Sequence, residues 1–334
     1  MKRFICLALC VMTALFVCAC DDNKAESGST PDTATVSQIA ETAPQTVVPT
    51  QPSGKRSLKD FIKSFDTTVT VEEKIIYKNA DMEVKAMGID YSPASGPELK
   101  LSFKNNFGKD ITIQAPYAVV NGYMVKPDMN VTVPYAKCGE GTLALPYYNL
   151  AMAGITSLQN IEFSLRVVDS KSYNPIHKTE LISVKTSAQP TEEPEYDESG
   201  QVVYDDNDIK IVLKGLNTTH VTSDGAELLV YMYNGTDKAI ALQTGDVKVN
   251  GYDMTSVMSC SLLPDKRAVD AVTFYAQDLD EYSIDEIDSV KVSFEIKDAE
   301  SWEELDSTEL FSVDMTIAAT QMTATDASTE KASE

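Results

Sequence analysis

Hydrophobic and polar residues alternate in short runs along most of the chain after about residue 67. Val69 to Val71, Met82 to Met87 and Leu99 to Phe103 are three such runs, and turn residues such as Asn121-Gly122 separate neighbouring runs. A period of two predicts half-buried β-strands. An Asn-Gly pair between two runs predicts a hairpin with a type I′ turn, because both residues accept a positive φ. The pattern therefore predicts an all-β fold of antiparallel strands.

This strand pattern occurs twice, at an offset of 129 residues. The segment Val-Asn-Gly-Tyr at 120–123 returns at 249–252, and the segment Thr-Glu-Leu-x-Ser-Val at 179–184 returns at 308–313. Residues 69–185 are named the first copy here, and residues 201–317 the second copy. About seven or eight short strands in each copy suit an immunoglobulin-like sandwich. The sequence thus predicts two tandem immunoglobulin-like antiparallel β-sandwiches.

A short amphipathic helix is predicted just before the first copy. Leu58, Phe61, Ile62 and Phe65 follow Ser57 with the spacing of a single helix face, and the serine provides a start like that of a capping box. We expect this helix to cover the core of the first copy.

Irregular segments are predicted where the alternation breaks. Single helical turns are expected at Asn149–Ala153 and Asp278–Tyr282. The second copy has two extra residues between Gly215 and Leu228, and insertions of this kind fall in surface loops. Thr218–Asp224 is therefore predicted to be a loop.

The N-terminal segment predicts export and a lipid anchor. Lys2 and Arg3 precede an apolar run from Phe4 to Ala19, which is shorter than the ~20 residues needed to span a bilayer. The small residue just before Cys20 resembles the lipobox of bacterial lipoproteins, although Cys18 departs from its usual second position. The resemblance implies that Cys20 is lipidated and that residues 1–19 are removed. An uncleaved anchor or a plain signal peptide is the alternative, and both also place the protein outside the cytoplasm.

The motif order of the two copies resembles a known family. Each copy has a tyrosine after a short strand, a strand ending in glycine, a strand ending in asparagine, the Val-Asn-Gly-Tyr segment and the closing Thr-Glu-Leu-x-Ser-Val strand. The whole is similar to immunoglobulin-like domains of unknown function that occur in lipoproteins of Gram-positive anaerobes. The resemblance implies a fold and an extracytoplasmic location at the cell membrane, and it supplies no catalytic or ligand-binding residues.

The expected organisation follows from these segments. It comprises a lipoprotein signal peptide at 1–19, a flexible Ser/Thr/Ala/Pro-rich tether at 20–56, a first sandwich with its leading helix at 57–187, an acidic linker at 188–200, a second sandwich at 201–317 and a disordered tail at 318–334. The prolines and like charges of the linker predict an extended, semi-rigid joint.

The net charge of −23 is carried mainly by the second copy. The first copy has 12 acidic and 12 basic residues, whereas the second has 24 acidic and 8 basic residues. A cationic surface for nucleic acid is therefore not expected. The acidic copy could attract a cationic protein partner or keep away from an anionic surface, and solubility alone would also explain its charge.

Few residues suggest catalysis or a cofactor. His177 and His220 are the only histidines, they lie in different copies, and neither has a histidine at its repeat-equivalent position. Only Cys138 and Cys260 remain in the two copies, and we expect two buried free thiols, with a disulfide bridge between the copies as the less favoured alternative. These observations favour a non-enzymatic interaction protein without a cofactor, and an enzyme that uses a loop histidine is a distant alternative.

Two acidic clusters raise the alternative of a calcium-stabilised adhesin-like protein. They lie at Asp205 to Asp208 and at Asp278 to Asp288, and carboxylates are ligands that calcium prefers. Neither cluster has the spacing of a calcium-binding loop. The equivalent segments of the first copy, Lys78 to Asp81 and Asn149 to Gln159, contain one acidic residue and none. A solvated turn and a solvated helix face are the simpler interpretations.

Overall fold

The computed structural model describes residues 56–188, 196–217, 225–256, 258–317 and 322–323. These residues belong to a single compact unit. They are mostly β-strand with three short helices, which confirms the all-β sandwich prediction. The predicted signal peptide, Cys20, the tether up to residue 55, His220 and the loop Thr218–Asp224 lie outside the described residues.

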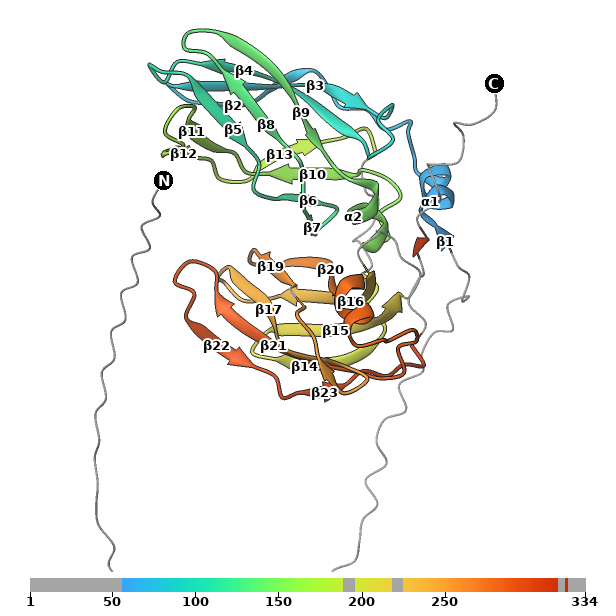
Figure 1. Cartoon of the computed structure of the whole chain (residues 1–334). Helices are drawn as coiled ribbons and strands as arrows, with labels where there is room; N and C mark the ends of the chain where they lie inside the picture. Colours follow the sequence, from blue (N-terminus) through green and yellow to red (C-terminus); the bar gives the residue numbers. More distant parts are fainter. Residues whose placement is uncertain (1–55, 189–195, 218–224, 257, 318–321, 324–334) are drawn as a thin grey trace, which may run out of the picture. The chain divides into compact units, whose positions relative to one another are not determined.

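The first copy packs a four-stranded antiparallel sheet against two further antiparallel sets of four short strands each (Figure 1). The four-stranded sheet has the order β2 (Lys74–Lys78), β3 (Met82–Asp90), β4 (Glu98–Asn105), β9 (Cys138–Ala144). One opposing set has the order β12 (Pro175–Lys178), β11 (Arg166–Asp169), β5 (Ile111–Gln114), β8 (Asn130–Val133). The other has the order β13 (Ile182–Lys185), β10 (Asn160–Phe163), β6 (Ala118–Val120), β7 (Tyr123–Val125).

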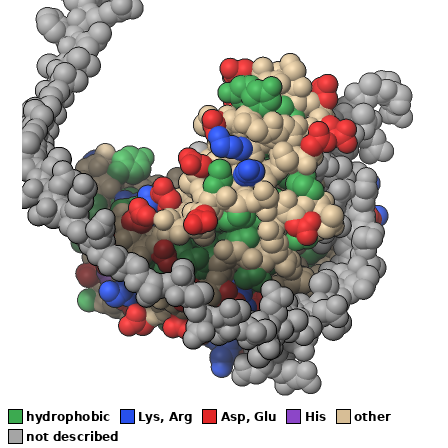
Figure 2. Space-filling model, turned by 90° about the horizontal axis from the view of Figure 1, so that it is seen from below, with side chains coloured by type: hydrophobic (Ala, Val, Ile, Leu, Met, Phe, Trp, Pro, Cys, Tyr) green, Lys and Arg blue, Asp and Glu red, His purple; other side chains and the backbone are tan. Residues whose placement is uncertain are grey.

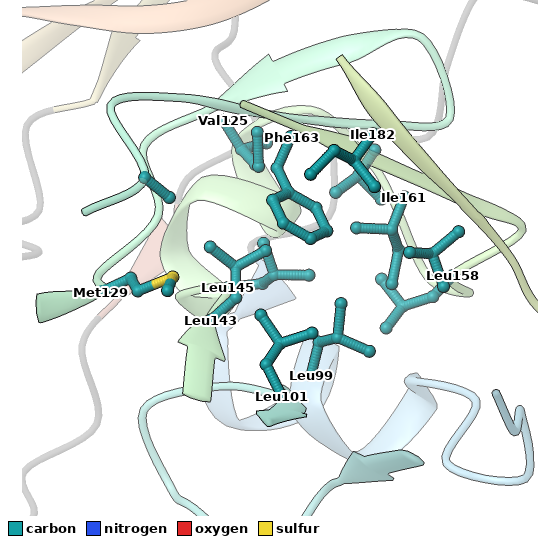
Figure 3. Packing of buried hydrophobic residues seen from close by; sticks show 14 of the residues in the cluster. Leu99, Leu101, Val125, Met129, Leu143, Leu145, Leu158, Ile161, Phe163 and Ile182 are labelled. Carbon is teal, nitrogen blue, oxygen red and sulfur yellow. The ribbon is translucent and has the colours of Figure 1, made fainter. Parts of the chain in front are cut away.

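The alternation seen in the sequence explains how the first core forms. On β4, Leu99 and Leu101 are buried while Lys100 between them is exposed. Figure 3 shows these two leucines pointing toward Ile161 and Phe163 of β10 across the core. The apolar faces of the two layers thus remove each other from water, which is the main stabilising term of such a sandwich.

The second copy has the same two layers. Its first layer contains β14 (Gln201–Asp206), β15 (Ile209–Asn217), β16 (Gly225–Asn234) and β20 (Lys266–Tyr275). Its second layer has the order β18 (Tyr252–Asp253), β17 (Ile240–Val249), β21 (Val290–Asp298), β22 (Glu304–Ser307), with β19 (Ser259–Leu262) on β17 and β23 (Phe311–Ser312) on β21.

Buried asparagines show that the duplication extends to individual hydrogen bonds. Asn105 and Asn234 occupy equivalent positions and are fully buried. Each donates its side-chain amide to two carbonyl oxygens, those of Lys109 and Val133 for Asn105 and those of Lys238 and Leu262 for Asn234. Because all four acceptors also correspond at the offset of 129, the two copies share one construction.

The predicted hairpins and helices are present. Asn121 and Gly122 have φ values of 51° and 86°, and their equivalents Asn250 and Gly251 have 49° and 88°, as type I′ turns require. The helix α1 (Leu58–Ser64) buries Phe61, whose ring meets Tyr147 edge-on at 6.4 Å. The turns predicted at 149–153 and 278–282 are α2 (Tyr147–Met152) and α3 (Ala276–Glu281), which begin two residues earlier than expected. No helix among the described residues is long and apolar enough to cross a membrane.

Two details differ from the prediction. Val69–Val71, expected to be a strand, forms only an isolated bridge between Val71 and Thr186. Met322–Thr323, inside the tail expected to be disordered, form β24 and pair in parallel with β1 (Arg56–Ser57). Main-chain hydrogen bonding does not depend on side-chain pattern, so a polar segment without alternation gives no sequence signal for such a pair.

Candidate functional site

His177 takes part in a contact that both copies contain. Its Nε2 lies 2.8 Å from the hydroxyl of Tyr77. In the second copy the equivalent tyrosine, Tyr204, donates its hydroxyl to Asp306 at 2.5 Å, and Asp306 is the repeat equivalent of His177. This hydrogen bond holds the pKa of Asp306 below its usual value. Residue 177 is therefore one half of a tyrosine contact that joins β12 to β2, as Asp306 joins β22 to β14.

The first acidic cluster is a hairpin turn. Asn207 and Asp208 connect β14 to β15 with φ values of 51° and 59°, and residues 205–208 are exposed. The solvated-turn interpretation is therefore confirmed for this segment. Within the described part of the chain, no group of three or more His, Cys, Asp or Glu residues could hold a metal ion.

The two cysteines of the copies are free, but only one is buried. Cys260 is 8% exposed, and burial raises the pKa of its thiol to about 12. Cys138 is exposed, which corrects the prediction that both thiols are buried. The reason is its position at the first residue of β9, the end strand of its sheet, where the burial pattern begins with an outward side chain.

The first Val-Asn-Gly-Tyr hairpin joins the two copies. Its strand β7 pairs in parallel with β20, so that one eight-stranded sheet runs through both copies in the order β13-β10-β6-β7-β20-β16-β15-β14. Three polar contacts accompany this pairing: Lys126 to Asp270 at 2.6 Å, Lys266 to Glu162 at 3.3 Å, and the Tyr148 hydroxyl to Glu227 at 2.6 Å. We refer to this region as the joint.

An arginine held by aromatic rings lies at the centre of the joint. The guanidinium of Arg267 stacks on the rings of Tyr196 and Tyr233, at 3.7 and 4.3 Å from their centroids. Tyr123 meets Tyr196 edge-on at 5.4 Å and Tyr231 at 6.5 Å. Burial raises the pKa of Tyr123 to about 12. The described end of the predicted linker is thus packed into the joint through Tyr196.

Carboxylates complete the surroundings of this arginine. Glu198 accepts hydrogen bonds from Lys210 and from the Tyr231 hydroxyl, and Asp265 accepts one from the Tyr233 hydroxyl. Burial raises the pKa of Glu198, but the two hydrogen bonds and the charges of Lys210 and Arg267 outweigh it and hold the pKa below its usual value. An arginine is therefore held here by tyrosine faces with carboxylates nearby.

The second Val-Asn-Gly-Tyr hairpin is not used in this way. Its tyrosine, Tyr252, is 48% exposed, whereas the equivalent Tyr123 is 7% exposed in the joint. Tyr252 stacks on Tyr282, itself 38% exposed, with ring centroids 4.8 Å apart and planes inclined by 20°. The strand that carries Tyr252, β18, ends its sheet, and no described strand pairs with its outer edge.

The second acidic cluster lies beside this tyrosine pair. Asn250 of the hairpin donates to the carbonyl of Glu286 and accepts the N–H groups of Asp288 and Ser289, which ties the acidic loop to the turn. We define the tyrosine-acid surface as Tyr252, Tyr282 and the exposed carboxylates of Asp253, Asp280, Glu281, Asp285, Glu286 and Asp288. In Figure 2, carboxylates lie across much of the visible face, with apolar side chains exposed between them.

The tyrosine pair has no direct signal in the sequence, because no dense aromatic patch is visible along the chain. The only pointers are the tyrosine kept at 252 and the replacement of Ala153 by Tyr282 at the equivalent position. The first copy also lacks the charge, since residues 149–159 contain no acid. The tyrosine-acid surface is therefore a property of the second copy alone.

Comparisons with known proteins show only distant likenesses. No protein-family model and no curated protein matches the chain. Among solved structures it is similar to the YadV chaperone, with 9% identity and a TM-score of 0.22 over 64% of this chain and 92% of that one. It is also similar to a DUF4785 family protein from Legionella pneumophila, with 15% identity and a TM-score of 0.23 over 70% of this chain and 57% of that one. A protein of unknown function from Porphyromonas gingivalis W83 has 11% identity and a TM-score of 0.20 over 74% of this chain and 96% of that one. TM-scores this low give these likenesses no weight for function.

Proposed function

We propose that this protein is a lipid-anchored protein of the extracytoplasmic face of the bacterial cell membrane, and that it is a non-enzymatic interaction module whose second copy contacts the partner. The observation that carries the proposal is the difference between the copies. The first is neutral and its hairpin tyrosine is buried in the joint, whereas the second is strongly acidic and its hairpin tyrosine is exposed.

The anchor rests on the N-terminal segment. A positive start, an apolar run and a cysteine at the point where the run ends are typical of a lipoprotein signal. A lipid-modified Cys20 with at least two acyl chains would hold the protein stably, because a single chain gives only marginal membrane binding. Residues 20–56 would then act as a flexible tether.

The joint supports a binding role better than a catalytic one. Parallel pairing of β7 with β20, three polar contacts and the stacked Arg267 link the second copy to the first. His177 makes the contact that an aspartate makes in the second copy, which favours a structural role for it. An exposed aromatic pair beside an unpaired strand end is typical of a protein-binding surface.

The anchor is tested by comparing the full chain with its Cys20→Ser variant in a bacterial host fed a labelled fatty acid. The proposal predicts label and membrane association for the wild type, loss of both for Cys20→Ser, and digestion by external protease once the outer layers are permeabilised. Equal labelling of the two proteins would contradict it. A Cys18→Ser variant is the matched control, and it should keep the label.

The calcium-stabilised alternative makes a different prediction. An adhesin held together by calcium would lose thermal stability in EDTA, since a ligand bound only to the folded state raises the midpoint. The interaction-module proposal predicts the same unfolding midpoint in EDTA and in millimolar calcium. A clear shift between the two conditions would favour the alternative.

A further inference from the structure

We propose that the tyrosine-acid surface binds an arginine-bearing segment of a partner protein. This inference deepens the proposed function, because it assigns the class of partner that the second copy recognises. It rests on the tyrosine pair, on the free edge of β18, on the charge around them and on the arginine site that the same protein builds in the joint.

The joint already contains an arginine that is held by tyrosine rings. There, Arg267 lies on the faces of Tyr196 and Tyr233, and its Nε is buried without a hydrogen-bond partner among the described residues. Stacking and nearby carboxylates therefore hold this guanidinium. A guanidinium suits this role because it is planar and more weakly hydrated than an ammonium group.

The hairpin that faces this arginine has its equivalent at the tyrosine-acid surface. In the first copy, Tyr123 of the hairpin pairs in register with Arg267 and packs against Tyr196. In the second copy, Tyr252 has the same place in its hairpin, a second tyrosine at 4.8 Å and an unpaired strand edge. The surface thus shares tyrosine rings and neighbouring carboxylates with the joint, but its two rings stack on each other, so an arginine would lie on an outer ring face.

The charge of the tyrosine-acid surface favours a cationic ligand over an anionic segment or a neutral sugar. Exposed carboxylates neighbour the two tyrosines along the chain and in the tied loop, and Lys248 is already paired with Asp253. A net-acidic surface raises the local concentration of a cationic segment and repels an anionic one. A neutral sugar would stack on the aromatic faces but would not be attracted by the carboxylates. An arginine-bearing segment can make both interactions.

The test uses the purified full chain and a short fluorescein-labelled peptide of alternating serine and arginine, followed by anisotropy. The same peptide with citrulline in place of arginine keeps the planar group and lacks the charge. We expect binding of the arginine peptide that weakens with added salt, little binding of the citrulline peptide, and an affinity loss of about fivefold to thirtyfold in the Tyr252→Ala/Tyr282→Ala variant.

Matched variants separate the surface from general charge. Tyr135→Ala removes a comparably exposed tyrosine of the first copy, and Asp205→Asn/Asp206→Asn removes exposed charge from the second copy at the hairpin turn. Both should bind the peptide nearly as well as wild type, whereas Asp280→Asn/Glu281→Gln should bind it several-fold more weakly. Hydrogen exchange of the wild-type complex should show protection at 250–254 and 278–288. This measurement uses only the wild-type protein, so it does not depend on whether a variant folds.

Three results would overturn the inference. The first is an equal loss of peptide affinity in Tyr252→Ala/Tyr282→Ala and in Tyr135→Ala, and the second is an equal loss of peptide affinity in the two charge variants. The third is salt-independent binding of chitin-type oligosaccharides by the wild type that Tyr252→Ala/Tyr282→Ala loses. The proposed function fails separately. A native partner that still co-purifies with the Tyr252→Ala/Tyr282→Ala variant would refute this surface and leave the interaction module standing, whereas an unlabelled Cys20 would refute the anchor.

Discussion

Gly122 and Gly251 occupy equivalent turns, but only Gly122 is packed against the joint. Both lie in type I′ turns with φ values of 86° and 88°. A Cβ at Gly122 would come within 2.3 Å of the Tyr196 hydroxyl oxygen, whereas a Cβ at Gly251 would meet nothing within 4 Å. The pair therefore separates the cost of the turn from the cost of disturbing the joint.

The two alanine variants should differ in stability by a measurable amount. Gly251→Ala places an L side chain in the left-handed region, which costs roughly 1 to 2 kcal/mol. Gly122→Ala carries the same cost and must also move Tyr196 away from Tyr123 and Arg267. Loss of one edge-on aromatic contact and of one cation–π contact adds about 1 to 3 kcal/mol.

Scanning calorimetry of the two variants measures this difference. Each kcal/mol should lower the unfolding midpoint by about 2 to 4 °C for a unit of this size. Adding Tyr196→Phe to Gly122→Ala removes the clashing hydroxyl and should recover part of the extra loss. Equal midpoints for Gly122→Ala and Gly251→Ala would refute the packing of Tyr196 in the joint.

Three further predictions concern the copies themselves. Asn105→Ala and Asn234→Ala should each destabilise the protein by roughly 2 to 4 kcal/mol in thermal melts, because each leaves two carbonyl oxygens without their amide donor. An unchanged unfolding midpoint for either variant would contradict the buried role of that asparagine. The N–H groups of Ser172 and Lys171, together with Lys109, lower the pKa of Asp169 to about 2. The stability that Asp169 contributes should thus be complete above about pH 4 and lost as the pH falls toward 2, so the gap between midpoints at pH 6 and pH 2.5 should be smaller in Asp169→Asn. Alkylation at pH 8 followed by peptide mapping should label Cys138 and spare Cys260, whose buried thiol has a raised pKa, and early labelling of Cys260 would count against its burial.

Local features of the fold could be predicted because their causes are local. The Asn-Gly turns, the alternation on β4 and the helix that carries Phe61 each depend on residues a few positions apart. The duplication added long-range information, since it placed equivalent turns and strands in both copies. Main-chain pairs such as β1 with β24, and the exposure of Cys138, depend on which strand ends a sheet, and no local pattern reports that.

The joint and the tyrosine-acid surface could not be predicted for the same reason. Arg267 meets Tyr196 and Tyr233 only after β7 has paired with β20, and Tyr252 meets Tyr282 only after Asn250 has tied its turn to the acidic loop. The repeat did show which copy differs, because the acidic cluster has no counterpart at 149–159. It could not show that this charge gathers around an exposed aromatic pair.

We propose that the second copy, and not the first, contacts the partner. The most direct measurement is cross-linking of the lipid-anchored protein in its native membrane, followed by mass spectrometry of the cross-linked peptides. The proposal predicts partner cross-links within the second copy that gather around 250–254 and 278–288. Cross-links confined to residues 69–185 of the first copy would contradict it.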